Sequence, residues 1–262
     1  GAPYGLYISA LTPVGGSFPL ATIYMDNYAF SNLSISNASA SAFYSNLSIF
    51  WNYIAYSKIF AGSWSLSKIS INNASNGIQI SHGDVVDSTN NSYSNISIAG
   101  AARGINITIV GASNFYTPSF DNNSFTGISI NDSTDAIYVN LAAIPNSKSF
   151  FRNNTFSNIS IRNATNGISM YANSSPGYVA SMSSNSFYNI SITGVANGFI
   201  FNLNGSAEAR STSISSSSVS GATAGIRIIA GDSNSSNFTI KSSNISGGVI
   251  GINSTNSTLA LS

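Results

Sequence analysis

The chain has 262 residues, of which only 6% are Asp, Glu, Lys or Arg, and its formal net charge is +1. So few basic side chains exclude a protein that binds nucleic-acid phosphates, and one His with no Cys leaves little material for a metal-rich or acid–base active site. Intrinsic disorder is excluded as well, because 43% of the residues are hydrophobic, including 13 Tyr and 15 Phe.

Residues 1–29 are predicted to form an apolar N-terminal segment. No charged residue occurs among the first 25, and the stretch from Tyr4 to Thr12 lacks Pro and suits a strand. We expect this strand either to fold back as a cap on its own solenoid or to leave its subunit and add to a neighbour's sheet. Its candidate assembly residues are Tyr4, Leu6 and Ile8.

Residues 30–255 repeat. Gly167 follows the run Phe156-Ser-Asn-Ile-Ser-Ile161 by six positions, and the pattern recurs 31 residues earlier and 31 residues later. The same spacing from an apolar to a small residue gives eight copies, 26 to 36 residues apart, whose small residues are Ser41, Gly77, Gly104, Ala136, Gly167, Gly198, Gly225 and Gly251. Apolar residues alternate within each copy, which predicts strands.

Equivalent positions of the copies keep the same chemistry, and Asn precedes the first of these columns by two residues in four consecutive copies. Stacked β-coils lie about 4.8 Å apart, so like side chains can form ladders inside the coil. We therefore predict an all-β fold, a single-stranded parallel β-helix (solenoid) of about eight coils, with an Asn ladder at one corner. The ladder would be Asn91, Asn123, Asn154 and Asn185; the three columns are Phe30, Leu66, Tyr93, Phe125, Phe156, Phe187, Ile214 and Ile240; Ile35, Ile71, Ile98, Ile130, Ile161, Ile192, Val219 and Ile245; and Ile78, Ile105, Ile137, Ile168, Phe199, Ile226 and Ile252.

The motif Asn-x-Phe-x-Asn-Ile-Ser-Ile, then a turn and Asn-Gly-Ile-x-Ile, resembles the repeats of right-handed parallel β-helix proteins of the pectate-lyase-like superfamily. The resemblance covers roughly residues 30–255. It implies the fold and leaves the function open, because that superfamily contains polysaccharide lyases and hydrolases, surface adhesins and non-enzymatic solenoids.

Few residues could carry chemistry. The segment 82–87 (His-Gly-Asp-Val-Val-Asp) is either a cation site or a polar turn, and residues 131–135 (Asn-Asp-Ser-Thr-Asp) occupy a corner; a turn explains both. Arg103 stands at the same corner one coil before Asp135, and a contact between them would be structural. Carboxylate pairs on adjacent coils, which glycoside hydrolysis needs, are not evident. We expect no catalytic, metal or cofactor-binding residue and no enzyme.

Residues 49–64 are rich in aromatic side chains. These either stack on sugar rings or cover the core or an open end of the solenoid, and we favour the covering role. They are Phe50, Trp51, Tyr53, Tyr56, Phe60 and Trp64.

The N-glycosylation sequon Asn-x-Ser/Thr occurs about 20 times, more often than the composition gives by chance. In Asn-Ile-Ser-Ile, alternation sends Ile inward and leaves Asn exposed. We predict covalent N-linked glycans, which with amides and hydroxyls would hydrate a surface that lacks charge. The predicted acceptors are Asn32, Asn37, Asn46, Asn73, Asn90, Asn95, Asn106, Asn122, Asn131, Asn153, Asn158, Asn163, Asn173, Asn189, Asn204, Asn234, Asn237, Asn244, Asn253 and Asn256.

These features predict a structural subunit of an extracellular, heavily N-glycosylated filament, sheath or surface layer at the cell surface. Its partners would be copies of itself, joined head to tail, and other cell-surface glycoproteins, with no nucleic acid. Leu259 and Leu261, in a C-terminal tail of residues 256–262, complete the candidate assembly residues. No run of about 18 apolar residues occurs, so no transmembrane helix is expected. Archaeal surface proteins resemble the chain in composition. The alternative is a monomeric β-helix carbohydrate-active enzyme or glycan-binding adhesin.

Overall fold

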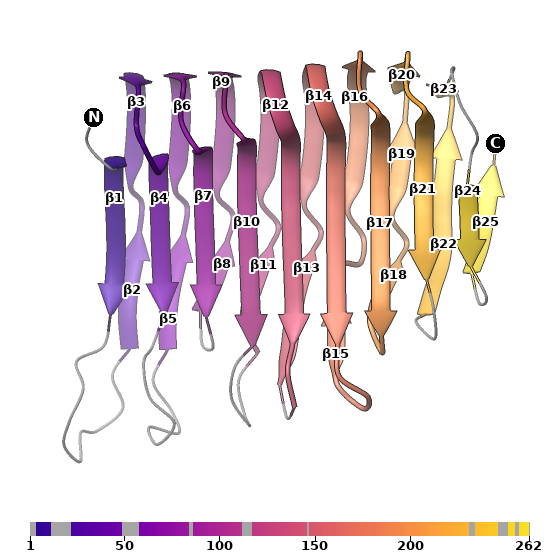
Figure 1. The fold of residues 1–262 in the computed structure, drawn as a ribbon. Coiled ribbons are helices and arrows are strands. Elements are labelled where there is room, and N and C mark those ends of the chain that lie inside the picture. Colours follow the sequence, from indigo (N-terminus) through magenta and orange to yellow (C-terminus); the bar gives the residue numbers. More distant parts are fainter. Residues whose placement is uncertain are drawn as a thin grey trace.

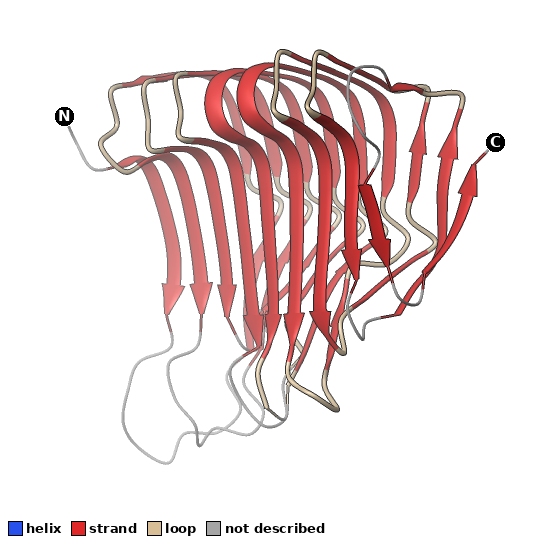
Figure 2. Cartoon of the chain, turned by 45° about the vertical axis from the view of Figure 1, so that its right-hand side comes forward, coloured by secondary structure: helices blue, strands red, loops and turns tan. Residues whose placement is uncertain are grey.

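The structure is a computed structural model that describes nine segments of the chain, residues 4–11, 22–48, 58–83, 86–111, 117–145, 147–230, 234–245, 251–254 and 257–261. Within these segments every regular element is a β-strand (Figure 2), and the strands join in one 25-stranded parallel sheet wound into a solenoid (Figure 1). The predicted all-β parallel β-helix is confirmed.

The strands stack in three parallel ladders. The front ladder, in the foreground of Figure 1, contains β1 (Tyr4–Leu11), β4 (Ser41–Ser48), β7 (Asn76–Gly83), β10 (Arg103–Gly111), the second halves of β12 (Ser124–Ala143) and β14 (Thr155–Ser174), β17 (Asn197–Gly205), β21 (Ala224–Ala230) and β24 (Gly251–Ser254).

The other two ladders lie behind the front ladder in Figure 1. The lower rear ladder contains β2 (Thr22–Asp26), β5 (Lys58–Gly62), β8 (Val86–Thr89), β11 (Ser119–Asp121), β13 (Lys148–Arg152), β15 (Val179–Ser181), β18 (Glu208–Arg210) and the start of β22 (Asn234–Lys241). The upper rear ladder contains β3 (Ala29–Ser36), β6 (Ser65–Asn72), β9 (Ser92–Ala99), the first halves of β12 and β14, β16 (Ser186–Thr193), β19 (Ser213–Ser215), β20 (Ser218–Ser220), the end of β22, β23 (Asn244–Ile245) and β25 (Ser257–Leu261).

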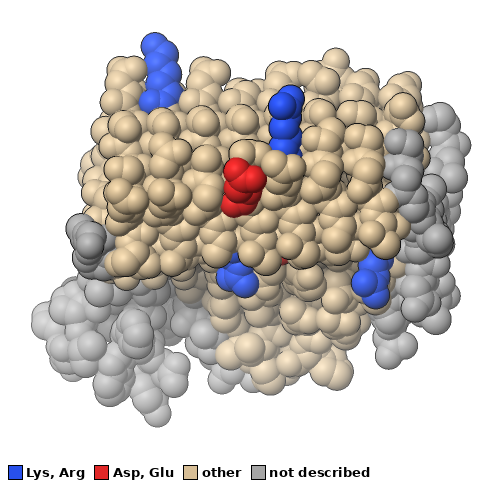
Figure 3. All heavy atoms as spheres, turned by 45° about the horizontal axis from the view of Figure 1, so that its top comes forward, with Lys and Arg blue, Asp and Glu red and all other residues tan. Residues whose placement is uncertain are grey.

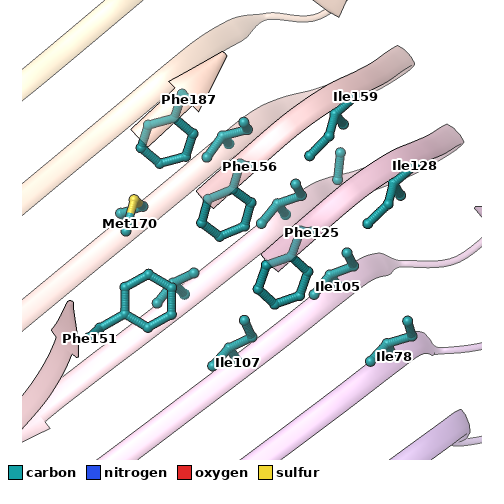
Figure 4. Close-up of a cluster of buried hydrophobic side chains, with 14 of the residues drawn as sticks. Ile78, Ile105, Ile107, Phe125, Ile128, Phe151, Phe156, Ile159, Met170 and Phe187 are labelled. Atoms are coloured by element: carbon teal, nitrogen blue, oxygen red, sulfur yellow. The ribbon is translucent and has the colours of Figure 1, made fainter. Parts of the chain in front are cut away.

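The core consists of the predicted columns. Phe125 pairs in register with Phe156, which pairs with Phe187, and the successive ring centroids are 4.7 and 5.0 Å apart with nearly parallel planes. Figure 4 shows these three rings in a row, beside isoleucines from the other strands. Equivalent side chains thus lie directly over one another, and a buried aromatic column of this kind is stabilised by both area burial and offset stacking.

Register differs from the prediction at two ends of the repeat. Ser41 pairs with Asn76, so that Ala42 rather than Ser41 lies opposite Gly77. At the other end Ile252 pairs with Ile228 rather than Ile226. The corners before β4 and β24 differ in number of residues from the corners of the other copies. Such differences are possible because only the strand residues must pair in register with the neighbouring coil.

About five turns, rather than the predicted eight, are described on all three faces. Further strands extend the three ladders on either side of these turns. The copies with Gly77, Gly104, Ala136, Gly167 and Gly198 at the small-residue position each have strands in all three ladders.

Three columns of residues with a left-handed backbone bend each turn. Their φ angles lie between 48° and 70°. Gly adopts this left-handed region freely, and Asn adopts it more readily than most other residues. The composition of the columns follows from this requirement: Asn27, Ser63, Asn90, Asn122, Asn153, Ser184 and Ser211; Asn32, Lys68, Asn95, Gly127, Asn158, Asn189, Ser216 and Ser242; and Asn37, Asn73, Gly100, Asp132, Asn163, Gly194 and Gly221.

The predicted Asn ladder is present and buried. Each side-chain oxygen accepts a hydrogen bond from the main-chain N–H of the preceding coil, from Trp64 to Asn91 (2.8 Å) and on through Asn123 and Asn154 to Asn185. The amide nitrogens donate to main-chain oxygens of the neighbouring corner. The ladder therefore pairs polar groups that the bend would otherwise leave unsatisfied.

The outward side of the upper rear ladder is made of hydroxyl side chains. Three in-register columns carry almost only Ser and Thr, because alternation turns every second residue away from the core. They are Ser65, Ser92, Ser124, Thr155, Ser186 and Ser213; Ser31, Ser67, Ser94, Thr126, Ser157 and Ser215; and Ser34, Ser70, Ser97, Ser129, Ser160, Ser191 and Ser218.

Candidate glycosylation and assembly surfaces

Most predicted glycan acceptors are exposed. Ten of the exposed ones belong to the left-handed columns, where the bend turns the side chain away from the core. The exposed acceptors are Asn32, Asn37, Asn73, Asn90, Asn95, Asn122, Asn153, Asn158, Asn163, Asn173, Asn189, Asn204 and Asn244.

Two predicted acceptors lie differently. Asn106 is 5% exposed, and its amide nitrogen donates to Asn76 Oδ1 at 3.2 Å. On the front ladder it is flanked by the larger Gln79 and Tyr138, so the nitrogen that a glycan would join is covered. Asn131 is half-buried. The side chains of the remaining five, Asn46, Asn234, Asn237, Asn253 and Asn256, lie outside the described part of the chain.

Charged side chains are few and scattered, and three pairs of them form salt bridges within the described segments. Figure 3 shows isolated Lys or Arg and Asp or Glu residues on a face that is otherwise uncharged. The predicted contact between Arg103 and Asp135 is present, with Nε 3.6 Å from Oδ2, and the guanidinium lies over the Tyr138 ring. Two further pairs were not expected from the sequence: Arg152 Nη2 lies 2.6 Å from Asp121 Oδ2, and Arg210 Nη2 lies 3.0 Å from Glu208 Oε2. The Arg103–Asp135 and Arg152–Asp121 pairs bridge adjacent coils in register, which supports a structural role, whereas Arg210 and Glu208 lie on one strand, β18.

The segment 82–87 does not present its histidine to a loop. β7 extends to Gly83, and His82 lies in a column between Leu47 and Ile109, 2% exposed and 5.6 Å from the Phe120 ring centroid. Asp87 accepts a hydrogen bond from Ser119, and Asp84 lies outside the described segments. Among the residues that the structure describes, no group of three or more His, Asp or Glu side chains is placed to hold a metal ion.

Burial lowers the pKa of His82 to about 3. In the unfolded chain the pKa of this histidine is about 6.5. Between pH 6.5 and 3 the unfolded chain therefore holds more protons than the folded protein. The free energy of unfolding consequently falls as the pH falls through this range. We expect His82→Leu, which restores the aliphatic column, to remove this loss, worth at most about 1.4 kcal/mol per pH unit. Urea unfolding of both proteins at pH 7.5, 5.5 and 4.5 measures it. The two proteins share all their carboxylates, which therefore contribute equally to both pH curves. Parallel curves would contradict the role of His82 in the loss of stability.

Of the aromatic segment 49–64, the side chains of Phe60 and Trp64 are described. Trp64 is 3% exposed and donates from Nε1 to the Met25 main-chain oxygen, beside the end of the Asn ladder. This position agrees with the covering role. Phe50, Trp51, Tyr53 and Tyr56 lie outside the described segments.

The candidate assembly residues lie on the outermost strands of the ladders. Tyr4, Leu6 and Ile8 are on β1, which pairs with β4 of its own chain, and the other edge of β1 has no partner strand in the described segments. Leu259 and Leu261 are on β25, where they pair with Phe238 and Ile240.

No protein-family model matches the sequence, and no curated protein is significantly similar to it. In the described segments, no helix has the length and apolar character that crossing a membrane requires.

Proposed function

We propose that this protein is a structural subunit of an extracellular, N-glycosylated filament, sheath or surface layer, built by head-to-tail stacking of solenoids. The observation that carries the proposal is the position of the sequons: thirteen acceptor side chains are exposed, most of them along bends that run the length of the solenoid. The resemblance to right-handed β-helix repeats and to the composition of archaeal surface proteins is consistent with this role.

The distribution of polar groups supports a surface dressed with sugars. An uncharged protein surface depends on amides and hydroxyls for hydration, and glycans would add to both. The hydroxyl columns and the exposed Asn columns alternate around the upper rear ladder, so attached sugars would stand beside a neutral polar surface. None of these hydroxyl or exposed Asn side chains belongs to the hydrophobic core.

A monomeric carbohydrate-active enzyme or adhesin is the second candidate. A glycoside hydrolase would need a pair of carboxyl groups facing one substrate. Asp121 and Asp135, on neighbouring coils, are each bound to an Arg, and His82 is enclosed in the core. The observations therefore favour the structural role.

Intact-mass measurement before and after enzymatic or chemical deglycosylation tests the coat on protein from its native source. We expect deglycosylation to lower the mass of the protein substantially, and glycopeptide analysis to find Asn158 occupied and the buried Asn106 unmodified. A mass that deglycosylation leaves unchanged would contradict the proposal.

Assembly has its own measurement. Sedimentation and negative-stain microscopy of the native protein should show polymers or layers. A monomer that stays dispersed at high concentration would favour the enzyme or adhesin.

A further inference from the structure

β1 is a complete strand of the front ladder. Its Gly5-Leu6-x-Ile8 repeats the Gly77-Ile78-x-Ile80 of β7, and it pairs with β4 in register along its length. Ile78 and Ile80 are 0% and 1% exposed, whereas Leu6 and Ile8 in the same columns are only half-buried. A strand added to the outer edge of β1 would therefore continue the core columns of the solenoid and cover Leu6 and Ile8.

The two outermost strands of the front ladder, β1 and β24, lack the features that usually block edge pairing. Natural edge strands carry charges, Pro or bulges that prevent addition of another strand. β1 (YGLYISAL), β24 (GINS) and β25 (STLAL) contain no charged residue and no Pro. A register shift between Ser235 and Phe238 interrupts the pairing of β22 with β25, and it leaves the front ladder unaffected.

The order in which the chain passes through the three ladders also matches at the two ends. Along the chain, an upper rear strand is followed by a front strand, as β3 by β4, β6 by β7 and β9 by β10. β25 is the outermost strand of the upper rear ladder, and β1 is a front strand. In coil order, β1 of a second copy therefore occupies the place that follows β25, and its β3 would lie over β25.

We propose that β1 of one copy adds in parallel to β24 of the next, in the register that sets Ile8 opposite Ile252 and Ser9 opposite Asn253. This inference rests on the proposed head-to-tail assembly and specifies its joint. Ile8 and Ile252 belong to one column of the front ladder, through Ile80 and Ile228. The same joint places Phe30 over Leu261, which share the aromatic column. A slip of one residue would turn every column to the other face, so the register is sharply defined.

Disulfide trapping tests the register, because the chain contains no Cys. Adjacent parallel strands lie about 4.8 Å apart, within disulfide range, whereas positions 9 and 253 of one chain are separated by eight ladder steps, about 38 Å at that spacing. Oxidised Ser9→Cys/Asn253→Cys should therefore form a covalent series of multimers on a non-reducing gel, at least tenfold more than the off-register control Ala10→Cys/Asn253→Cys. Tyr7→Cys/Gly251→Cys is a second in-register pair and should form the same multimers. It keeps the register testable if the first pair fails to fold.

The outcomes separate the two proposals. Polymers by sedimentation that cross-link equally in both registers, or only in the control, would overturn the register and leave head-to-tail assembly standing. Monomers in the wild type and in every variant would overturn the assembly and, with it, the joint.

Discussion

Replacing Asn154 by Ala is expected to destabilise the solenoid by roughly 3–5 kcal/mol. Asn154 Oδ1 accepts hydrogen bonds from the main-chain and side-chain nitrogens of Asn123 (2.9 and 3.1 Å), and its Nδ2 donates to the Phe120 oxygen (2.9 Å). All of these groups are buried, and water cannot replace the lost partner. Each buried group left unsatisfied costs about 1–3 kcal/mol. Urea unfolding followed by circular dichroism measures the effect.

Asn158→Gly is the matched control for Asn154→Ala. Asn158 is exposed, and its column of left-handed residues already contains Gly127. Its replacement should change stability by no more than about 0.5 kcal/mol when both variants are compared without glycans. Equal losses in the two variants would show that the buried ladder has no special part in stability.

Phe156→Ala should cost about 3–5 kcal/mol, because it removes the middle ring of a buried stack. The Phe156 ring lies 4.7 Å from that of Phe125 and 5.0 Å from that of Phe187, and all three are 0% exposed. Since each coil of a solenoid is stabilised by its neighbours, a cavity at a central coil weakens two interfaces at once. Thermal and urea unfolding measure the loss.

Two further variants separate the cavity from other effects. Phe156→Leu should cost clearly less than Phe156→Ala, because it leaves a smaller cavity and Leu66 already occupies the column. Tyr188→Ala removes a ring of similar size from the outer side of β16, where it is 49% exposed, and should be nearly neutral. A loss at Tyr188 as large as that at Phe156 would contradict a core built on the column.

Much of the fold follows from the sequence, because a solenoid repeats one environment many times. Phe125, Phe156 and Phe187 recur 31 residues apart, so three independent copies report on a single stacked position. The Asn ladder follows by the same reasoning. Corner length is less constrained: the bend between Ile35 and Ala42 has one residue more than its neighbours, and no strand pairing fixes that number.

Single residues within the repeat were harder to predict. The motif Gly5-Leu6-x-Ile8 is typical of a front strand, but the spacing from an apolar to a small residue cannot be tested on it, because the position six residues before Gly5 lies outside the 262 residues. His82 followed by Gly and Asp reads as a turn, whereas pairing with β4 and β10 extends the strand through it. Asn106 alternates outward in sequence, yet its larger neighbours cover it.

The hydroxyl columns have a consequence for the medium in which the solenoid works. Dissolved ions weaken attraction and repulsion between exposed charges and have little effect on dipoles such as Ser and Thr hydroxyls. With 6% charged residues, and with two of the described ion pairs, Arg103–Asp135 and Arg152–Asp121, holding adjacent coils together, the electrostatic part of the stability of this protein should change little between fresh water and brine.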